Sequence, residues 1–287
     1  MTDRIPASIE VAPKQAIESE ALPGLFPSGT SVYITDIGTD TIADHVAAAR
    51  RVRDLGYEPV PHFASRRLTA RDQLEERVAR LSAEAGVRDV LVIGGGLPRE
   101  AGDFASTMHV LETGVFDRNA IRRIGVAGHP EGSPDFGEEA AIQALRLKQA
   151  FAERTGADLR IVTQFGFAPD TFIEWAKSLK SNGIDLPVHL GVAGPATLKT
   201  LLRFAALCGV GNSIAFLKHH ALKVTALAGT QSPETVVEPI EAFWRANPDG
   251  PIAQIHAFPF GGIAKTSDWL FERGSWLHEQ AMRTAAE

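Results

Sequence analysis

The feature that most constrains this chain is a repeated alternation of short apolar runs with longer stretches of helical periodicity. The runs are rich in β-branched residues and are continuously apolar, which is typical of parallel strands covered on both faces. The segments between them place apolar side chains near one stripe and charges opposite. The expected strands are Ser8–Ala12, Ser31–Thr35, Glu58–Phe63, Asp89–Gly94, Arg123–Gly128, Arg160–Phe165, Pro187–Val192 and Ile252–Phe258. The expected helices include Thr41–Leu55, Ala70–Ala85, Glu138–Arg154, Pro169–Ser181 and Ala196–Ala206.

Eight strands alternating with helices over 287 residues predict an α/β fold, a single closed (β/α)8 TIM barrel. An open doubly wound sheet is the alternative. The connection from Gly194 to Gly250 is long enough for more than one helix, so extra helices are expected between strands 7 and 8. Because no linker, low-complexity segment or internal repeat interrupts the pattern, we expect one domain over residues 1–287.

Composition narrows the class of protein further. The net charge of −6 provides no basic surplus for nonspecific nucleic-acid binding. The single cysteine, Cys208, excludes an internal disulfide framework, and its apolar neighbours predict a buried thiol. No apolar run approaches the roughly 20 residues that span a bilayer, and the N-terminus lacks a signal-peptide pattern. We therefore expect no membrane association and a cytoplasmic location.

Polar residues recur where the expected strands end. In a barrel these carboxyl ends share one face, which is where binding sites lie. Burying polar groups on apolar strands is costly unless they are paired or used. The recurrence therefore predicts a site built from Glu10, Thr35, His62, Gly94–Gly96, His129, Gln164 and His256.

Individual positions leave alternatives open. Glu10, between Ile9 and Val11, could be a salt-bridged rim carboxylate or a carboxyl that keeps its proton near neutral pH and delivers it. His62 and His129 could be structural or functional, and no zinc-type spacing supports a metal site, so none is predicted. Gly94–Gly96 could let the backbone approach a ligand closely, although it does not fit GxGxxG. The basic pair Arg66-Arg67 could be part of a solvated surface, as most such clusters are, but it follows the third strand and so lies on this face.

Several of these segments, in this order, resemble the methylenetetrahydrofolate reductase family, which reduces 5,10-methylenetetrahydrofolate to 5-methyltetrahydrofolate. The resemblance runs from Ser8 to about Phe260 and implies the same (β/α)8 barrel. The motifs that carry it are Ser8–Lys14, Val32–Thr35, Pro61-His62, Gly125–Gly132, Thr163–Phe165 and Asn182–Val188.

The resemblance implies roles for particular residues. Glu10 falls on the general acid that protonates the folate N10, and Gln164 falls on the amide that contacts the pterin. Phe204 falls on an aromatic residue lining the folate and nicotinamide site, and Thr35 falls near the substrate. The implied cofactor-binding residues are His62, Gly94, Gly95, Gly96 and His129. The implied hydride donor is NADH or NADPH, and FAD is the family cofactor.

The chain departs from the family where flavin is bound. Flavin-binding members carry Leu-Arg-Gly-Asp where this chain has Ile93–Gly96, and Tyr-Pro-Glu where it has His129–Glu131. The departures fit a branch of the family that passes hydride directly from the nicotinamide to the folate. A tetrahydrofolate-dependent methyl or one-carbon transferase, or a non-catalytic folate-binding protein, are alternative interpretations. Barrels of this kind often associate, so a homo-oligomer is allowed. Comparison with the larger relatives of this family leads us to expect a catalytic domain over residues 1–287 without their C-terminal regulatory domain.

Overall fold

The computed structural model describes residues 3–133, 136–208, 210 and 229–277. Eight strands close into a barrel in the order β1-β10-β7-β6-β5-β4-β3-β2, which confirms the predicted fold class. The pairs β1–β10, β10–β7, β2–β3, β3–β4 and β4–β5 are parallel. The barrel strands are β1 (Ala7–Val11), β2 (Ser31–Ile34), β3 (Glu58–Ala64), β4 (Asp89–Ile93), β5 (Arg123–Gly128), β6 (Asp158–Gly166), β7 (Val188–Ala193) and β10 (Ile252–Phe258).

The predicted helices are present to within two residues at each end. Two helices of the described residues, α8 and α10, fall between the seventh and eighth barrel strands, where the sequence predicted more than one. Four short elements had no sequence signal, because helices of three to six residues are too short to show periodicity: α1, η1, α4 and α5. The helices are α1 (Pro13–Glu18), α2 (Ile42–Asp54), the 3₁₀ turn η1 (Ser65–Arg67), α3 (Arg71–Ala85), α4 (Thr107–Leu111), α5 (Val115–Arg118), α6 (Glu138–Thr155), α7 (Pro169–Ser181), α8 (Leu198–Leu207), α10 (Glu234–Ala246) and α11 (Ile263–Glu272). A two-stranded antiparallel sheet joins β8 (Ala196–Thr197) to β9 (Thr230–Gln231).

The chain divides into two compact units, each assembled from separate stretches of sequence. Unit 1 comprises residues 1–9, 128–143 and 163–287, and unit 2 comprises residues 10–127 and 144–162. Each is described by itself below.

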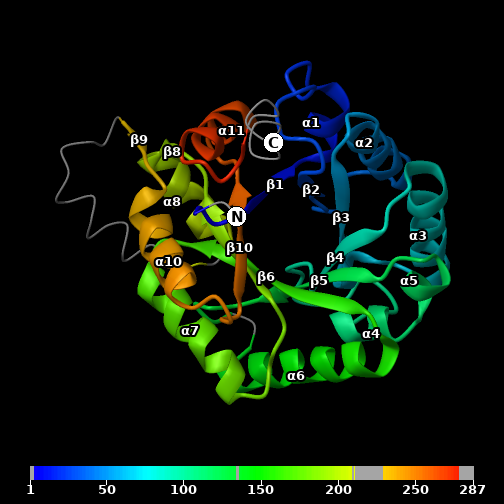
Figure 1. Ribbon diagram of the computed structural model, residues 1–287. Coiled ribbons are helices and arrows are strands. Elements are labelled where there is room, and N and C mark those ends of the chain that lie inside the picture. Colours follow the sequence, from blue (N-terminus) through cyan, green and yellow to red (C-terminus); the bar gives the residue numbers. More distant parts are fainter. Residues whose placement is uncertain (1–2, 134–135, 209, 211–228, 278–287) are drawn as a thin grey trace, which may run out of the picture. The chain divides into compact units, whose positions relative to one another are not determined.

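Unit 2 is built around the strands β2, β3 and β4, with α2 and α3 packed against each other beside them (Figure 1). Tyr33, Val60, Leu91 and Val162 form a buried cluster on the inner side of these strands. Below it, the Arg160 guanidinium donates to Asp89 at 2.8 Å and to the Tyr33 hydroxyl at 3.0 Å. Burial raises the pKa of Tyr33 to about 12, so its hydroxyl stays protonated and keeps this contact.

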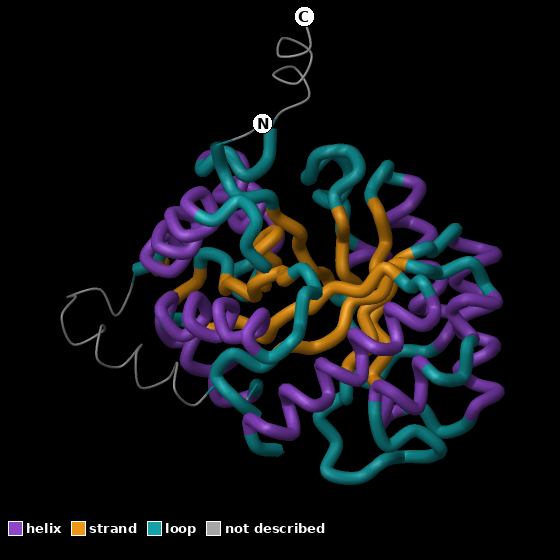
Figure 2. Tube along the Cα trace, turned by 60° about the horizontal axis from the view of Figure 1, so that its bottom comes forward, coloured by secondary structure: helices purple, strands orange, loops and turns teal. Residues whose placement is uncertain are grey.

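Unit 1 is organised around β10, which pairs with β1 on one side and β7 on the other. The helices α7 and α10 pack side by side, and in Figure 2 helices cover the outer side of its strands. Cys208, at the end of α8, is exposed, so the predicted buried thiol is wrong. The helix is apolar on more than one face: Ala205 is buried, while neighbouring Leu207 is 72% exposed.

Candidate functional site

Four neighbouring strand ends of unit 2 carry predicted site residues, and we call this set the polar rim: Glu10, Thr35, His62 and Gly94–Gly96. Glu10 is half-buried on β1 between the fully buried Ile9 and Val11, as the sequence predicted. The Thr35 N–H donates to the Val11 carbonyl at 3.0 Å, which brings the end of β2 beside the end of β1. His62 is buried on β3, and its ring meets the Tyr33 ring edge-on at 5.9 Å.

A buried ion pair fixes the ends of β2 and β3. The Arg77 guanidinium, from α3, donates to the Asp36 carboxylate at 2.7 Å and to the His62 carbonyl at 2.7 Å. Both side chains are almost fully buried, at 7% and 6% exposure. Burial alone would raise the pKa of Asp36, but the charge and hydrogen bond of Arg77 hold it below its usual value. Asp36 is therefore ionised at neutral pH, and the pair sets the positions of Thr35 and His62.

Sequence reasoning missed Arg77, although one signal was present. It lies on the buried stripe of α3 with Leu74, Val78 and Leu81, and a charged residue there implies a buried partner. His45, on α2, interacts electrostatically with the Asp36–Arg77 pair. Burial, reinforced by the charge of Arg77, lowers the pKa of His45 to about 4. Its ring is therefore neutral at pH 7.

The three glycines of the loop after β4 differ in how strongly their local structure requires glycine. Gly95 has φ +97°, and a Cβ there would lie 3.0 Å from the Ala64 Cβ. Gly96 also has a positive φ, +64°. Gly94 has ordinary backbone geometry, and an added Cβ would meet only the Arg66 Nη2, at 3.9 Å. Local structure therefore explains glycine at 95 and 96, and leaves Gly94 without a structural reason.

In unit 1 one predicted residue, Phe204, belongs to a set of rings that we call the aromatic cluster, and another, His256, contacts it through Phe258. The cluster consists of Phe165, Phe167, Phe204, Phe258 and Phe260. The buried Phe165 ring contacts those of Phe167, Phe258 and Phe260 at 4.7–5.7 Å between centroids. Phe204 from α8 stacks on Phe260, 4.1 Å apart and 14° from parallel. Phe260 was missed in the sequence, where the Phe258-Pro259-Phe260 pattern was the available signal.

Gln164 lies at the end of β6, directly before Phe165. Its Oε1 accepts from the Phe165 N–H at 3.1 Å, which orients the side-chain amide. The neighbouring strand approaches unusually closely: a Cβ on Gly191 would lie 2.5 Å from the Thr163 carbonyl oxygen and 2.7 Å from that of Gln164. Close backbone packing therefore fixes the position of Gln164.

His129 follows β5 and meets the Phe136 ring edge-on at 5.0 Å. The adjoining Glu131 packs against the end of β6, because a Cβ on Gly166 would lie 2.6 Å from its Oε1. The His129–Glu131 segment therefore lies beside the end of the Gln164 strand. His256, deeper in unit 1, pairs with the Ser8 hydroxyl at 3.0 Å.

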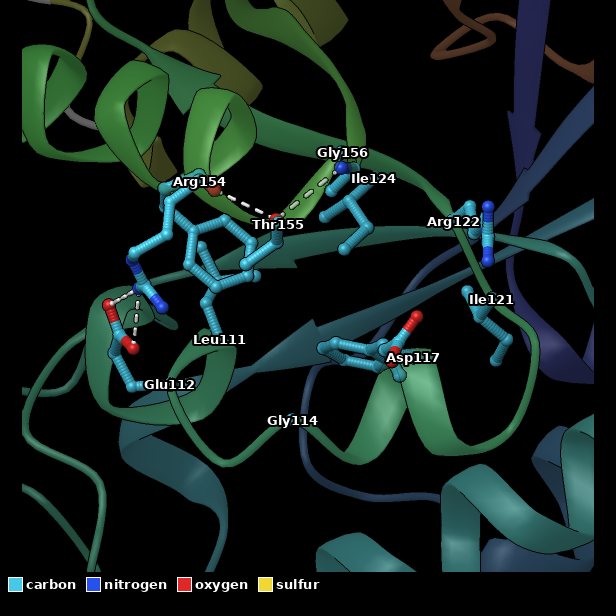
Figure 3. A pocket seen from close by; sticks show the side chains of 13 residues that line it. Leu111, Glu112, Gly114, Asp117, Ile121, Arg122, Ile124, Arg154, Thr155 and Gly156 are labelled. Atoms are coloured by element: carbon cyan, nitrogen blue, oxygen red, sulfur yellow. Dashed lines mark hydrogen bonds and ion pairs between the residues drawn. The ribbon is translucent and has the colours of Figure 1, made fainter.

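The cavity in Figure 3 lies within unit 2. It has a volume of about 240 Å³ and is lined by residues that precede β5 and β6, including Ile121, Arg122 and Gly156. The paired Glu112 and Arg154, 2.6 Å apart, close one side of it. None of the predicted site residues lines it. Within the described residues, no group of three or more His, Cys, Asp or Glu side chains could hold a metal.

A closed parallel barrel with polar side chains at the carboxyl ends of its strands defines the (β/α)8 class. Within that class, the chain belongs to the methylenetetrahydrofolate reductase family, because a model of that family matches residues 25–221. No helix in the described part of the chain has the length and apolar character needed to cross a membrane.

Relatives support the family at modest identity. The 5,10-methylenetetrahydrofolate reductase of Pectobacterium carotovorum is 30% identical over 160 residues, which is 54% of this chain and 50% of the relative. Methylenetetrahydrofolate reductase 1 of Schizosaccharomyces pombe is 39% identical over 88 residues, 30% of this chain and 14% of the relative. The matches thus span half or less of these relatives.

A solved structure shares the fold. It is described as an uncharacterized protein from Clostridium thermocellum that binds two copies of 5-methyl-5,6,7,8-tetrahydrofolic acid. It aligns with a TM-score of 0.55 over 94% of this chain and 98% of that one, at 13% identity. At this identity the likeness concerns the fold alone.

Proposed function

We propose that this protein is a methylenetetrahydrofolate reductase that uses NADH or NADPH to convert 5,10-methylenetetrahydrofolate to 5-methyltetrahydrofolate. The observation that carries the proposal is family membership over residues 25–221, together with polar groups at the strand ends where the family resemblance expects them. The printed names of the reductase relatives and the folate bound by the Clostridium thermocellum neighbour support the same substrate class. A cytoplasmic location is part of this proposal.

In this proposal Glu10 is the general acid. Glu10 lies on a strand between Ile9 and Val11, which are both nearly inaccessible to solvent. Glu10 itself is half-buried, so a ligand can reach its carboxyl group. It delivers a proton to the folate N10, which opens the five-membered ring to the reactive iminium. The nicotinamide supplies the hydride that reduces the methylene carbon. Thr35 and His62 line the bound ligands, with their backbone positions held by the Asp36–Arg77 pair.

Gln164 and Phe204 bind the folate. The Gln164 side-chain oxygen accepts from the Phe165 N–H. The side-chain NH2 group is the part of the amide that donates to the edge of the pterin in this proposal. Phe204 presents a half-buried ring already stacked on Phe260, and such a face suits a planar heterocycle. His129 lies among the cofactor-binding residues in this proposal.

The residues of the glycine loop do not fit the flavin pattern of the family, so no step is assigned to FAD. Positions 94 and 96 lack the arginine and aspartate of flavin-binding members, and a Cβ at Gly96 would meet nothing within 4 Å. We propose that hydride passes directly from the nicotinamide to the folate.

The test combines purified protein, NADH or NADPH, and 5,10-methylenetetrahydrofolate, with the visible absorption spectrum recorded first. The expected result is a colourless protein that forms one 5-methyltetrahydrofolate per nicotinamide oxidised. Stoichiometric FAD that co-purifies and is needed for turnover would overturn direct transfer. Methyl transfer without nicotinamide consumption would identify a transferase, and folate binding without turnover a binding protein. Either result would overturn the reductase.

We further propose that residues 1–287 unfold as one domain. All four tryptophans (Trp175, Trp244, Trp269 and Trp276) lie in unit 1, so their fluorescence reports that unit alone. Far-ultraviolet circular dichroism reports both units. Coincident urea midpoints are expected, and two separated transitions would show that the units are independent domains.

A further inference from the structure

Two consecutive arginines of unit 2 hold the glycine loop by its carbonyl groups. Arg66 donates from its backbone N–H to the Gly94 carbonyl at 3.0 Å, and from its guanidinium to the Leu97 carbonyl at 2.6 Å. Arg67 donates from Nε to the Gly95 carbonyl at 3.0 Å. Both guanidinium groups are therefore anchored at the carboxyl ends of β3 and β4, the end where the polar rim lies.

The positions of the two guanidinium groups depend on neighbouring glycines. Arg66 Nη2 lies 3.9 Å from the place a Cβ would take at Gly94, so its charge stands beside that position. Arg67 Nη1 lies only 2.7 Å from the corresponding place at Gly38, in the loop after β2. Arg67 thus occupies the space that Gly38 leaves.

The same loop has hydrogen-bond donors that the described part of the chain does not use. The N–H groups of Gly95 and Gly96 donate no hydrogen bond to any described residue. Their φ values of +97° and +64° belong to left-handed backbone. Successive N–H groups in turns of this kind form concave sites for anions. Gly96 is exposed and Gly95 half-buried, so a ligand can reach them.

The charge balance also favours an anion. No carboxylate of a described residue lies within ion-pair distance of Arg67. Asp36, the acid at the end of β2, is already held by Arg77 at 2.7 Å. The Arg67 guanidinium fork and two backbone donors, around glycines that leave room for a ligand, match a negatively charged group with several oxygens.

We propose that Arg67 and the N–H groups of Gly95 and Gly96 bind the diphosphate of a dinucleotide, while Arg66 holds the loop through the Gly94 and Leu97 carbonyls. The inference rests on the proposed function in one respect, namely that a nicotinamide dinucleotide is the hydride donor. FAD carries the same diphosphate, so the experiment separates the two sources. The competing interpretation is that Arg67 also only fastens the loop, in which case its substitution changes stability and not ligand selectivity.

The test measures the affinity of wild-type protein and variants for NADH, for dihydronicotinamide riboside (which lacks the diphosphate), for FAD and for inorganic pyrophosphate. The variants are Arg67→Gln and Arg67→Lys, the second of which keeps the charge but loses the planar fork. Arg88→Gln is the matched control, because Arg88 also donates to a main-chain carbonyl (Val87, at 2.7 Å) but directly precedes β4, at its other end. Thermal unfolding of each variant checks the fold.

We expect Arg67→Gln to weaken NADH and pyrophosphate binding roughly tenfold to a hundredfold, with riboside affinity changed by less than about threefold. Arg67→Lys is expected to fall between, and Arg88→Gln to match wild type. If Arg67→Gln weakens the binding of FAD but not that of NADH, the diphosphate bound at this site belongs to the flavin. Equal loss of NADH and riboside affinity, or no loss of either, would overturn the proposal.

The proposed function can fail separately. If the protein binds pyrophosphate through Arg67 but does not reduce the folate, the diphosphate site stands and the proposed reductase function is wrong. A reductase whose KM for NADH is unchanged in Arg67→Gln keeps the activity and loses this site.

Discussion

In the polar rim, charges hold the site in place, whereas in the aromatic cluster rings pack against rings. Thr35 and His62 are positioned by one almost fully buried ion pair, Asp36–Arg77. Phe204 is positioned by a stacking contact with Phe260, within a set of rings that share Phe165. Loss of one charge leaves its partner buried and unpaired, which is costly. Loss of one partly exposed ring leaves its neighbours still packed. Single substitutions should therefore lower the unfolding free energy strongly in the polar rim (a brittle site) and only slightly in the aromatic cluster (a tolerant one).

The largest expected effect is on the rim. Arg77→Met leaves the Asp36 carboxylate and the His62 carbonyl without their donor, and we expect a loss of roughly 3 to 5 kcal/mol in unfolding free energy. Urea denaturation measures it. Adding Asp36→Asn should restore part of the loss. Arg80→Met on the exposed face of the same helix, where Arg80 pairs with Glu84 at 2.7 Å, is the control and should unfold like wild type. Equal stability of both single variants would refute the brittle rim.

The second prediction concerns the pH dependence of stability that arises from His45, beside the Asp36–Arg77 pair. His45 has a pKa of about 4 in the folded protein against 6.5 as the ordinary value. Between these values the unfolded chain takes up a proton that the folded protein does not. Stability is thus fully present above pH 6.5 and falls as pH drops towards 4, by roughly 3 kcal/mol for this group.

His45→Asn should flatten that part of the stability curve, measured by urea titration at pH 4 to 7. His109→Asn, at an exposed histidine of unit 2, is the control and should keep the wild-type slope. Parallel curves for wild type and His45→Asn would show that the ring is not buried in its neutral form.

A smaller effect is expected in the aromatic cluster. Phe204→Leu removes a half-buried ring from the stack with Phe260, so stability should change little, while folate affinity should fall about threefold to tenfold. Fluorescence titration with 5-methyltetrahydrofolate measures the affinity. Phe243→Leu on α10, another half-buried ring of unit 1, should leave the affinity unchanged. A large loss of stability in Phe204→Leu would mean that the cluster is as brittle as the rim.

The smallest effect compares two neighbouring glycines. Gly95→Ala places a Cβ at φ +97° and 3.0 Å from the Ala64 Cβ, so we expect a loss of about 1 kcal/mol or more. Gly94→Ala meets only Arg66 Nη2, at 3.9 Å, and should leave the thermal midpoint close to that of wild type. If the two variants are equally destabilised, Gly94 has a structural reason that its geometry does not reveal.

Strands and long helices could be predicted from the sequence because each carries its own periodic pattern. The strand Ile252–Phe258 is identical in prediction and structure, and Pro169–Ser181 is an exact match for α7. Short helices such as α4 could not be predicted, since five residues cannot display a period of 3.6. Cys208 was placed wrongly because apolar neighbours along a helix do not say which face it presents.

The candidate site shows the same limit. Glu10 and Gln164 could be singled out because each interrupts an apolar strand, and family resemblance implied their roles. Arg77 reaches the rim from the middle of α3, 41 residues from Asp36, and Phe260 meets Phe204 from another element. Such partners depend on tertiary packing, which no local pattern encodes.

The measurement that tests the central claim most directly is the reductase rate of Glu10→Gln. With NADH and 5,10-methylenetetrahydrofolate at saturation, we expect a rate reduced by roughly 10² to 10⁴, because the proton donor is lost, with folate binding retained. Glu18→Gln, at the end of α1 in the same stretch of chain, is the control and should keep the wild-type rate. A Glu10→Gln protein that forms 5-methyltetrahydrofolate at the wild-type rate would contradict the account.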